Sequence, residues 1–170
     1  MKTPDLETAS PRRRPPTGWQ RLVARLPIFL FGCGLGGVFG KRLLLLHHTG
    51  RVSGLDRRVV LEVVEHAPDS GSWVVASGFG PGASWYQNLR EQPKTLIQAG
   101  TRHFAVTAHF LPPEEGADIM ARYASRHPRV ARRLCAFLGL PSDGTAAGFR
   151  QAGRGIPFVR LQADSSSRLP

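Results

Sequence analysis

The feature that most constrains the fold is an apolar run, Leu43–Leu46, that leads through two histidines into a glycine-bracketed loop, Thr49–Gly54. A continuous apolar run of this length is typical of a buried strand. Gly50 and Gly54 tolerate backbone angles that let N–H groups converge, and Arg51 lies between them. Converging amides beside a guanidinium favour a bound phosphate, although a hairpin turn with a solvated arginine is the commoner structure for such a sequence. The stretch therefore predicts a strand that ends at an anion-binding loop.

Five further stretches have the alternation or the β-branched content of strands. They are Arg57–His66, Trp73–Ser77, Lys94–Ala99, His103–Leu111 and Ile156–Leu161. Short turns rather than helices separate most of them, which favours an antiparallel barrel over a parallel sheet with crossover helices. The predicted fold class is therefore mainly β, a barrel of about six antiparallel strands with peripheral helices.

A first helix is predicted to begin at Ser84, directly after a glycine-rich loop, Ser77–Gly82. Ser84 and Gln87 have the spacing of a capping box, in which the serine side chain accepts from the glutamine amide. Glycine-rich loops let backbone approach a ligand closely, and a helix N-terminus adds partial positive charge. This corner is either a second anion-friendly site or only a tight turn.

A second helical stretch is predicted over Pro113–Leu138. It opens with proline followed by two glutamates, which suit a first helical turn. A kink is expected at His127–Pro128, because proline cannot donate the hydrogen bond that a helix interior needs.

The charge balance indicates an anionic partner. Lys and Arg number 23 against 12 Asp and Glu, a net charge of +11. Nucleic acid, an anionic membrane face and a polyanionic cofactor would each satisfy such a surface potential. No recognition-helix, zinc-knuckle or RNP-like pattern is present in the sequence, so nucleic acid is not expected.

The 170 residues suit a single domain. Residues 1–18 are rich in Pro, Arg, Thr and Ser and are expected to form a disordered basic tail, followed by a cofactor-binding domain over residues 19–162 and a C-terminal tail over 163–170. Leu26–Gly40 is apolar but too short to span a bilayer. It is expected to pack over the core as a flap or, with the basic residues between 12 and 42, to rest on an anionic membrane.

The cell location follows from what the sequence contains. Cys33 and Cys135 form neither a disulfide framework nor a CxxC pair, and no signal peptide is expected from the N-terminal pattern. We therefore expect a cytoplasmic protein, with a peripheral position on the inner face of the cell membrane as the variant of this hypothesis.

No catalytic constellation or metal site is predicted. The sequence has no GxSxG or HExxH motif, and His47 and His48 would point to opposite faces of a continuing strand. These histidines are expected either to be satisfied by hydrogen bonds within the protein or to be exposed to solvent. A barrel with two phosphate-friendly loops and no obvious acid, base or nucleophile suits a protein that orients a bound redox cofactor.

Several motifs together resemble one family. Thr49–Gly54 with Arg57, then Val75–Ser77 with its glycine-rich loop, then Trp85–Leu89 and Pro93 are similar in order and spacing to the deazaflavin-dependent nitroreductases. The resemblance runs from about Trp19 to about Leu161. It implies a split β-barrel like that of FMN-binding oxidases, the deazaflavin coenzyme F420 as cofactor, and hydride transfer to a quinone or a nitro compound.

The resemblance also implies roles for individual residues. Those expected around the cofactor phosphate and acidic tail are Thr49, Gly50, Arg51, Ser53, Gly54 and Arg57. Those expected along the ring and ribityl chain are Ser77, Gly78 and Gly80, with Phe79 and Trp85 as pocket walls and Asn88 in the same motif. Relatives commonly carry lysine where this chain has Val52 and Leu55, and residues 139–148 resemble an inserted loop.

Two other functions stay open at this level. One is an FMN-binding split-barrel reductase, and the other is a non-catalytic binder of a deazaflavin, a lipid or another anionic ligand. The expected partners are a small-molecule acceptor, either a quinone or a nitroaromatic compound, and a second copy of the chain in a homo-oligomer.

Overall fold

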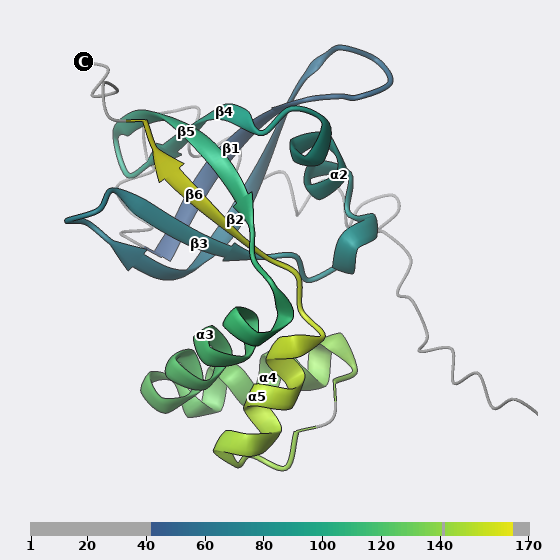
Figure 1. The fold of residues 1–170 in the computed structure, drawn as a ribbon, viewed down its shortest axis with the longest axis vertical. Helices are drawn as coiled ribbons and strands as arrows, with labels where there is room; N and C mark the ends of the chain where they lie inside the picture. The colour runs from purple at the N-terminus through teal and green to yellow at the C-terminus, as the bar shows by residue number, and fades with distance from the viewer. Residues whose placement is uncertain (1–41, 141, 165–170) are drawn as a thin grey trace, which may run out of the picture.

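Six antiparallel strands form one closed barrel in the order β1-β2-β3-β6-β5-β4 (Figure 1). The computed structural model describes residues 42–140 and 142–164, so the predictions for the N-terminal tail and for Leu26–Gly40 lie outside the described residues. The strands are β1 Leu43–Thr49, β2 Asp56–Ala67, β3 Ser72–Ala76, β4 Lys94–Ala99, β5 Arg102–Phe110 and β6 Phe158–Ala163. This architecture confirms the predicted fold class.

Strand β1 closes the barrel because it pairs with β2 on one side and with β4 on the other. Its side chains alternate between the two faces of the sheet. Leu44 and Leu46 point into the barrel core, where they meet Leu61 of β2 and Ile97 of β4. Burying a leucine side chain fully contributes roughly 1.5–3 kcal/mol, so this strand is a large part of what holds the barrel shut. The strand continues beyond the predicted apolar run, since Thr49 still pairs with Asp56.

A layer of three helices covers the outer face of β3 and β6 (Figure 1). The helices are α3 Pro113–Arg126, α4 Pro128–Leu138 and α5 Ala146–Arg154. Val74 of β3 and Phe158 of β6 pack against Ile119 and Met120 of α3 in a second core. The expected break at His127 is present, because its backbone angles, φ −136° and ψ 59°, are not helical.

Helix α5 was not predicted, because residues 139–148 resemble an inserted loop. The helix begins inside that stretch, with Thr145 at its N-cap, where the threonine side chain accepts a hydrogen bond from the Gly148 amide at 3.0 Å. Phe149, Ala152 and Gly153 are its buried residues. A capping threonine, followed by residues that lie three and four positions after Phe149 on the same side of the helix, is the signal that would have indicated this helix.

Helix α2, Ser84–Glu91, begins where the sequence predicts, but the predicted capping box is wrong. Ala83 occupies the N-cap, so Ser84 lies one residue inside the helix and cannot cap it. The Gln87 backbone amide donates to the Ala83 carbonyl oxygen at 3.0 Å. Its side-chain amide donates instead to the carbonyl oxygen of Pro81, at 2.6 Å, in the short 3-10 helix η2 Gly80–Gly82.

Within the described part of the chain, none of the helices has the length and apolar character needed to cross a bilayer.

Helices α3 and α5 approach each other at a pair of glycines. A Cβ atom added at Gly153 would lie 2.6 Å from the Gly116 carbonyl oxygen and 2.7 Å from the Met120 Cβ. A Cβ added at Gly116 would in turn lie 2.9 Å from the Gly153 carbonyl oxygen. Backbone atoms of two packed helices cannot move apart without disturbing the second core, so glycine is required at this crossing.

We expect Gly153→Ala to lower the free energy of unfolding by about 1–3 kcal/mol, because the new methyl group overpacks the α3–α5 crossing. Gly155→Ala is the matched control, since its Cβ would make only ordinary contacts, at 3.4 Å from Leu140 and 3.5 Å from the Ala152 carbonyl oxygen. Urea denaturation of both variants measures the difference. Equal midpoints for the two variants would contradict the close crossing.

Candidate functional site

The loop that joins β1 to β2 is held by its own backbone. The Gly54 amide donates to the Gly50 carbonyl oxygen at 2.7 Å, and the Gly50 amide donates to the Leu55 carbonyl oxygen at 2.8 Å. Gly54 has a φ of 67°, a backbone angle that residues with a side chain rarely adopt. Gly50 leaves room for two side chains, because a Cβ there would lie 2.6 Å from the Ser53 Oγ and 2.9 Å from the Arg57 Nε.

These bonds change the predicted mode of anion binding. The amides of Gly50 and Gly54 donate within the loop, and the Arg51 amide donates to the Asn88 side chain at 3.1 Å. They do not converge on an external point as the sequence analysis predicts. These three amides are therefore not free for an anion, and the side chains of Arg51, Ser53 and Arg57 are further donors in the loop and beside it.

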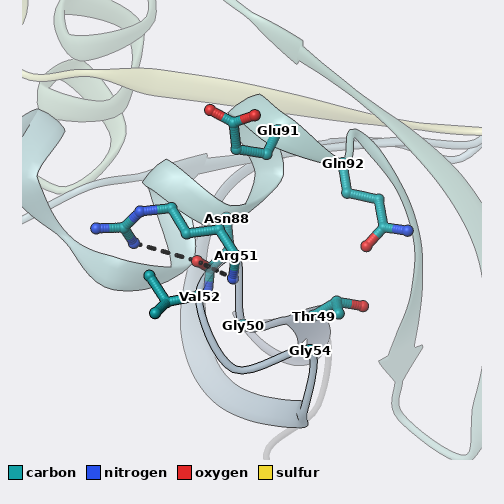
Figure 2. A pocket seen from close by; sticks show the side chains of 8 residues that line it. All are labelled: Thr49, Gly50, Arg51, Val52, Gly54, Asn88, Glu91 and Gln92. Atoms are coloured by element: carbon teal, nitrogen blue, oxygen red, sulfur yellow. Dashed lines mark hydrogen bonds between the residues drawn. The ribbon is translucent and has the colours of Figure 1, made fainter.

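A pocket of about 570 Å³ lies between this loop and helix α2 (Figure 2). Its lining residues are Thr49, Gly50, Arg51, Val52, Gly54, Asn88, Glu91 and Gln92. Five of the eight are residues predicted for the site, and they come from two segments far apart in the sequence. Glu91 and Gln92 were missed, although their spacing of three and four from Asn88 places all three on one side of the helix end.

Asn88 is the centre of a hydrogen-bond network at the back of the pocket. Its Oδ1 accepts from the Arg51 amide at 3.1 Å and from the Arg51 Nη1 at 3.2 Å, and both contacts are drawn in Figure 2. Its Nδ2 lies 2.8 Å from the Nδ1 of His48 on β1. Asn88 is only 3% exposed and His48 only 6% exposed. The buried network therefore ties the strand, the loop and the helix together.

The network also defines the state of the His48 ring. Because the Asn88 oxygen already accepts two hydrogen bonds, its NH₂ group faces the histidine, and the His48 Nδ1 must accept. A ring that accepts at Nδ1 is neutral and carries its proton on Nε2. Burial of the ring lowers the pKa of His48, and the nearby Arg57 guanidinium lowers it further. His48 was predicted only as a satisfied or exposed histidine, and it is the satisfied kind.

Arg51 and Arg57 are among the arginines of the described residues that form no ion pair with a carboxylate. Six arginines pair with carboxylates: Arg42, Arg58, Arg122, Arg150, Arg154 and Arg160. Arg51 instead meets the neutral amide of Asn88, and the Arg57 Nη2 donates to the Ser53 Oγ at 3.4 Å. Within residues 42–140 and 142–164 neither has a carboxylate at ion-pair distance. Their positive charge is available to an anionic ligand.

The glycine-rich loop does not line this pocket. Ser77 is buried, and its hydroxyl donates to the Gly80 carbonyl oxygen at 2.6 Å while the Gly80 amide donates back to the Ser77 carbonyl oxygen at 2.9 Å. Gly78 and Phe79 between them are exposed. Trp85, predicted as a pocket wall, is buried in the barrel core beside Tyr86 and does not line this pocket.

The departures at Val52 and Leu55 leave apolar side chains in solvent. Val52 is 92% exposed and Leu55 is 63% exposed, so neither stabilises the fold by burial. Lysines at these positions would add charge at the rim of the pocket.

No cluster of three or more metal-binding side chains occurs among the residues that the structure describes.

Barrel, helical layer and arginine-bearing loop together define a split-barrel protein with a pocket between the β1–β2 loop and α2. Residues 30–135 match the family model described as F420H(2)-dependent quinone reductase. The chain belongs to this family, and it is an F420H2-dependent oxidoreductase. The match gives no support to the FMN-binding or the non-catalytic alternative.

Solved structures share this fold at low sequence identity. A protein described as a domain-swapped dimer is 22% identical, with a TM-score of 0.50, over 85% of this chain and 100% of that chain. A conserved hypothetical protein from Mycobacterium tuberculosis is 16% identical, with a TM-score of 0.50, over 75% of this chain and 76% of that chain. An F420-H2 dependent reductase, FDR-A, is 23% identical, with a TM-score of 0.49, over 72% of this chain and 95% of that chain.

Stability should fall as the pH is lowered below about 6.5, the usual pKa of histidine in an unfolded chain. Burial lowers the pKa of His48, and also that of His47, where Asp56 opposes the effect. The unfolded chain then binds protons that the folded protein does not, so acidification favours unfolding until the folded pKa values are reached. Urea denaturation between pH 7.5 and 5.0 measures the slope. His48→Asn should flatten it, and replacement of the exposed His109 by Asn should not.

Proposed function

We propose that the protein transfers a hydride from reduced F420 to a quinone, and that the loop between β1 and β2 binds the anionic part of the cofactor. The observation that carries this proposal is the pair of guanidinium groups, Arg51 and Arg57, that line or border a pocket without a carboxylate partner in the described residues. When bound, reduced F420 supplies the hydride from its C5.

The donor set of the pocket fits such an anion. Arg51 offers a planar guanidinium suited to phosphate or carboxylate oxygens, and Thr49 adds a hydroxyl in the same lining. Gly50 leaves the space that the Ser53 hydroxyl and the Arg57 guanidinium occupy. A larger residue at position 50 would push these two donors away from the loop.

Glu91 restricts where the anion lies in the pocket. Its carboxylate is part of the lining, and it stands in the last turn of α2, where the helix dipole is negative. An anion beside this helix end would be repelled, whereas the loop side offers the two arginines. The anionic group therefore binds at the loop, with Asn88 holding Arg51 in place from behind.

The acceptor is proposed from the family description, which names quinones rather than nitro compounds. The half-exposed Phe79 is our candidate for a surface on which a flat acceptor packs. No side chain of the protein is required as a nucleophile, so the residues act by binding and orienting the reactants.

Turnover tests the acceptor. Purified protein with reduced F420 should oxidise the cofactor when a menaquinone analogue is added, measured by the return of cofactor absorbance, and more slowly with a nitroaromatic compound. Turnover with the nitroaromatic alone would reassign the acceptor. Tight binding of FMN together with no binding of F420 would reject the proposed cofactor.

Arg51→Ala should weaken F420 binding about tenfold to a hundredfold, because a charge-assisted contact to an anion contributes roughly 1.5–3 kcal/mol. Stability should change by at most about 0.5 kcal/mol, since Arg51 is exposed and its loss opens no apolar cavity. Calorimetric titration and thermal melts measure the two effects. Arg58→Ala is the matched control, because Arg58 pairs with Asp56 at 3.6 Å and should leave affinity nearly unchanged. Normal binding by the Arg51 variant would refute the loop assignment.

We further propose that the protein is cytoplasmic and forms a homo-oligomer. The similarity to a protein described as a domain-swapped dimer supports the oligomer. We also propose contact with an anionic membrane through residues 12–42, a segment that lies outside the described residues except for Arg42. Light scattering during gel filtration gives the oligomeric state, and a monomer mass would reject it.

A further inference from the structure

We propose that His48 is a positioning residue for the anion site: its neutral ring holds Asn88 in the orientation that fixes Arg51, so protonation of His48 releases Arg51 and weakens anion binding. The inference rests on the proposed function insofar as the anion is part of F420. It assigns a role to a buried histidine that does not line the pocket itself.

The first step of the argument is the number of hydrogen bonds that Asn88 can make. Its oxygen holds the Arg51 amide at 3.1 Å and the Arg51 Nη1 at 3.2 Å, and its NH₂ group meets the His48 Nδ1 at 2.8 Å. All three contacts require the same orientation of the side-chain amide. They also require that His48 accept rather than donate at Nδ1.

Protonation of His48 breaks this arrangement. A charged imidazole carries protons on both nitrogens, so two donors would then face each other across the His48–Asn88 contact. The Asn88 amide relieves the conflict by turning its oxygen toward the ring. That turn takes the oxygen away from Arg51. The hydrogen bonds to the Arg51 backbone amide and to its guanidinium are then both lost.

The charges around His48 decide when this happens. Arg57 and Asp56 face it from β2, His47 precedes it on β1, and Arg51 shares the Asn88 amide on α2. Arg57 and His47 disfavour a positive ring, and Asp56 favours it. The buried position adds to the first effect, so the neutral ring that positions Arg51 is the form at neutral pH.

A second effect of the same proton has the opposite sign. One more positive charge near the pocket attracts an anion through space, and this attraction alone would strengthen binding at low pH. The positioning role predicts weaker binding at low pH. The direction of the pH dependence therefore separates the two.

The experiment is calorimetric titration with F420 from pH 7.5 to pH 5.0 on a set of variants. We expect the affinity of the parent protein to fall up to about tenfold as the pH is lowered, the loss expected from a freed charge-assisted contact. His48→Asn keeps an acceptor close to the ring Nδ1 position and does not titrate. Its affinity for F420 should therefore be the same at every pH in this range. His48→Phe, which keeps a ring but no acceptor, should bind weakly at every pH.

Two controls exclude other causes. Arg51→Ala should bind weakly with no further loss at low pH, because its contact is already absent. His47→Asn, on the opposite face of the same strand, should keep the pH dependence of the parent. Any titration of the cofactor itself affects all variants equally, so these expectations apply to the pH dependence that remains after this shared part is subtracted. A rise in parent affinity at low pH, or a parent-like pH dependence in His48→Asn, would overturn the positioning role.

A readout without cofactor keeps the inference separate from the proposed function. Nitrogen NMR of the His48 ring should show a proton on Nε2 alone at pH 7.5, and the protection factor of the Arg51 backbone amide, its exchange rate relative to the intrinsic rate at each pH, should fall with the same midpoint as ring protonation. Exchange independent of that midpoint would overturn the inference. If F420 does not bind the parent at any pH, the proposed cofactor site fails, and the ring and exchange data still decide the role of His48.

Discussion

The alternation of side chains along β1 is the constraint on which the rest of the structure depends. This strand hydrogen-bonds to β2 and to β4, so its register closes the barrel. The alternation that turns Leu44 and Leu46 into the core also turns His48 inward at the end of the strand. A shift by one residue would turn Leu44 and Leu46 out of the barrel core and remove the histidine from Asn88. Packing of the barrel and geometry of the site are therefore set by one register.

The described arginines divide into those that pair with carboxylates and those that do not. On the outer surface, Arg122 meets Glu65, and Arg160 meets Glu115, so the strands and α3 are joined by ion pairs. Exposed pairs of this kind contribute little each, roughly 0.2–1 kcal/mol, and they leave little charge for a ligand. Arg51 of the β1–β2 loop and Arg57 at the start of β2 bond to neutral groups instead. Part of the positive charge that no carboxylate balances therefore lies at the pocket or beside it.

Local patterns in the sequence predicted the strands well and the tertiary contacts poorly. The bounds of β4 are those predicted, because its alternation and flanking turns are local signals. Helix α5 escaped notice because its two glycines lower its intrinsic propensity, and packing against α3 stabilises it instead. The contact between His48 and Asn88 spans 40 positions, and no local pattern encodes it. The loop sequence indicated an anion site. Only the three-dimensional structure shows that the amides of Gly50, Arg51 and Gly54 already donate hydrogen bonds within the protein.

The three helices lie in the segment of residues 111–157, which connects two strands, β5 and β6, that pair directly with each other. Phe110 of β5 faces Val159 of β6, so the chain leaves the barrel and returns to it at one place. This segment is an insertion between two paired strands, so its length and sequence can change without altering the strand register on either side. Closure of the barrel and the pocket at α2 do not use its residues. The helical layer is therefore the part of this fold that can diversify, or be exchanged for another, while the barrel and the pocket at α2 stay unchanged.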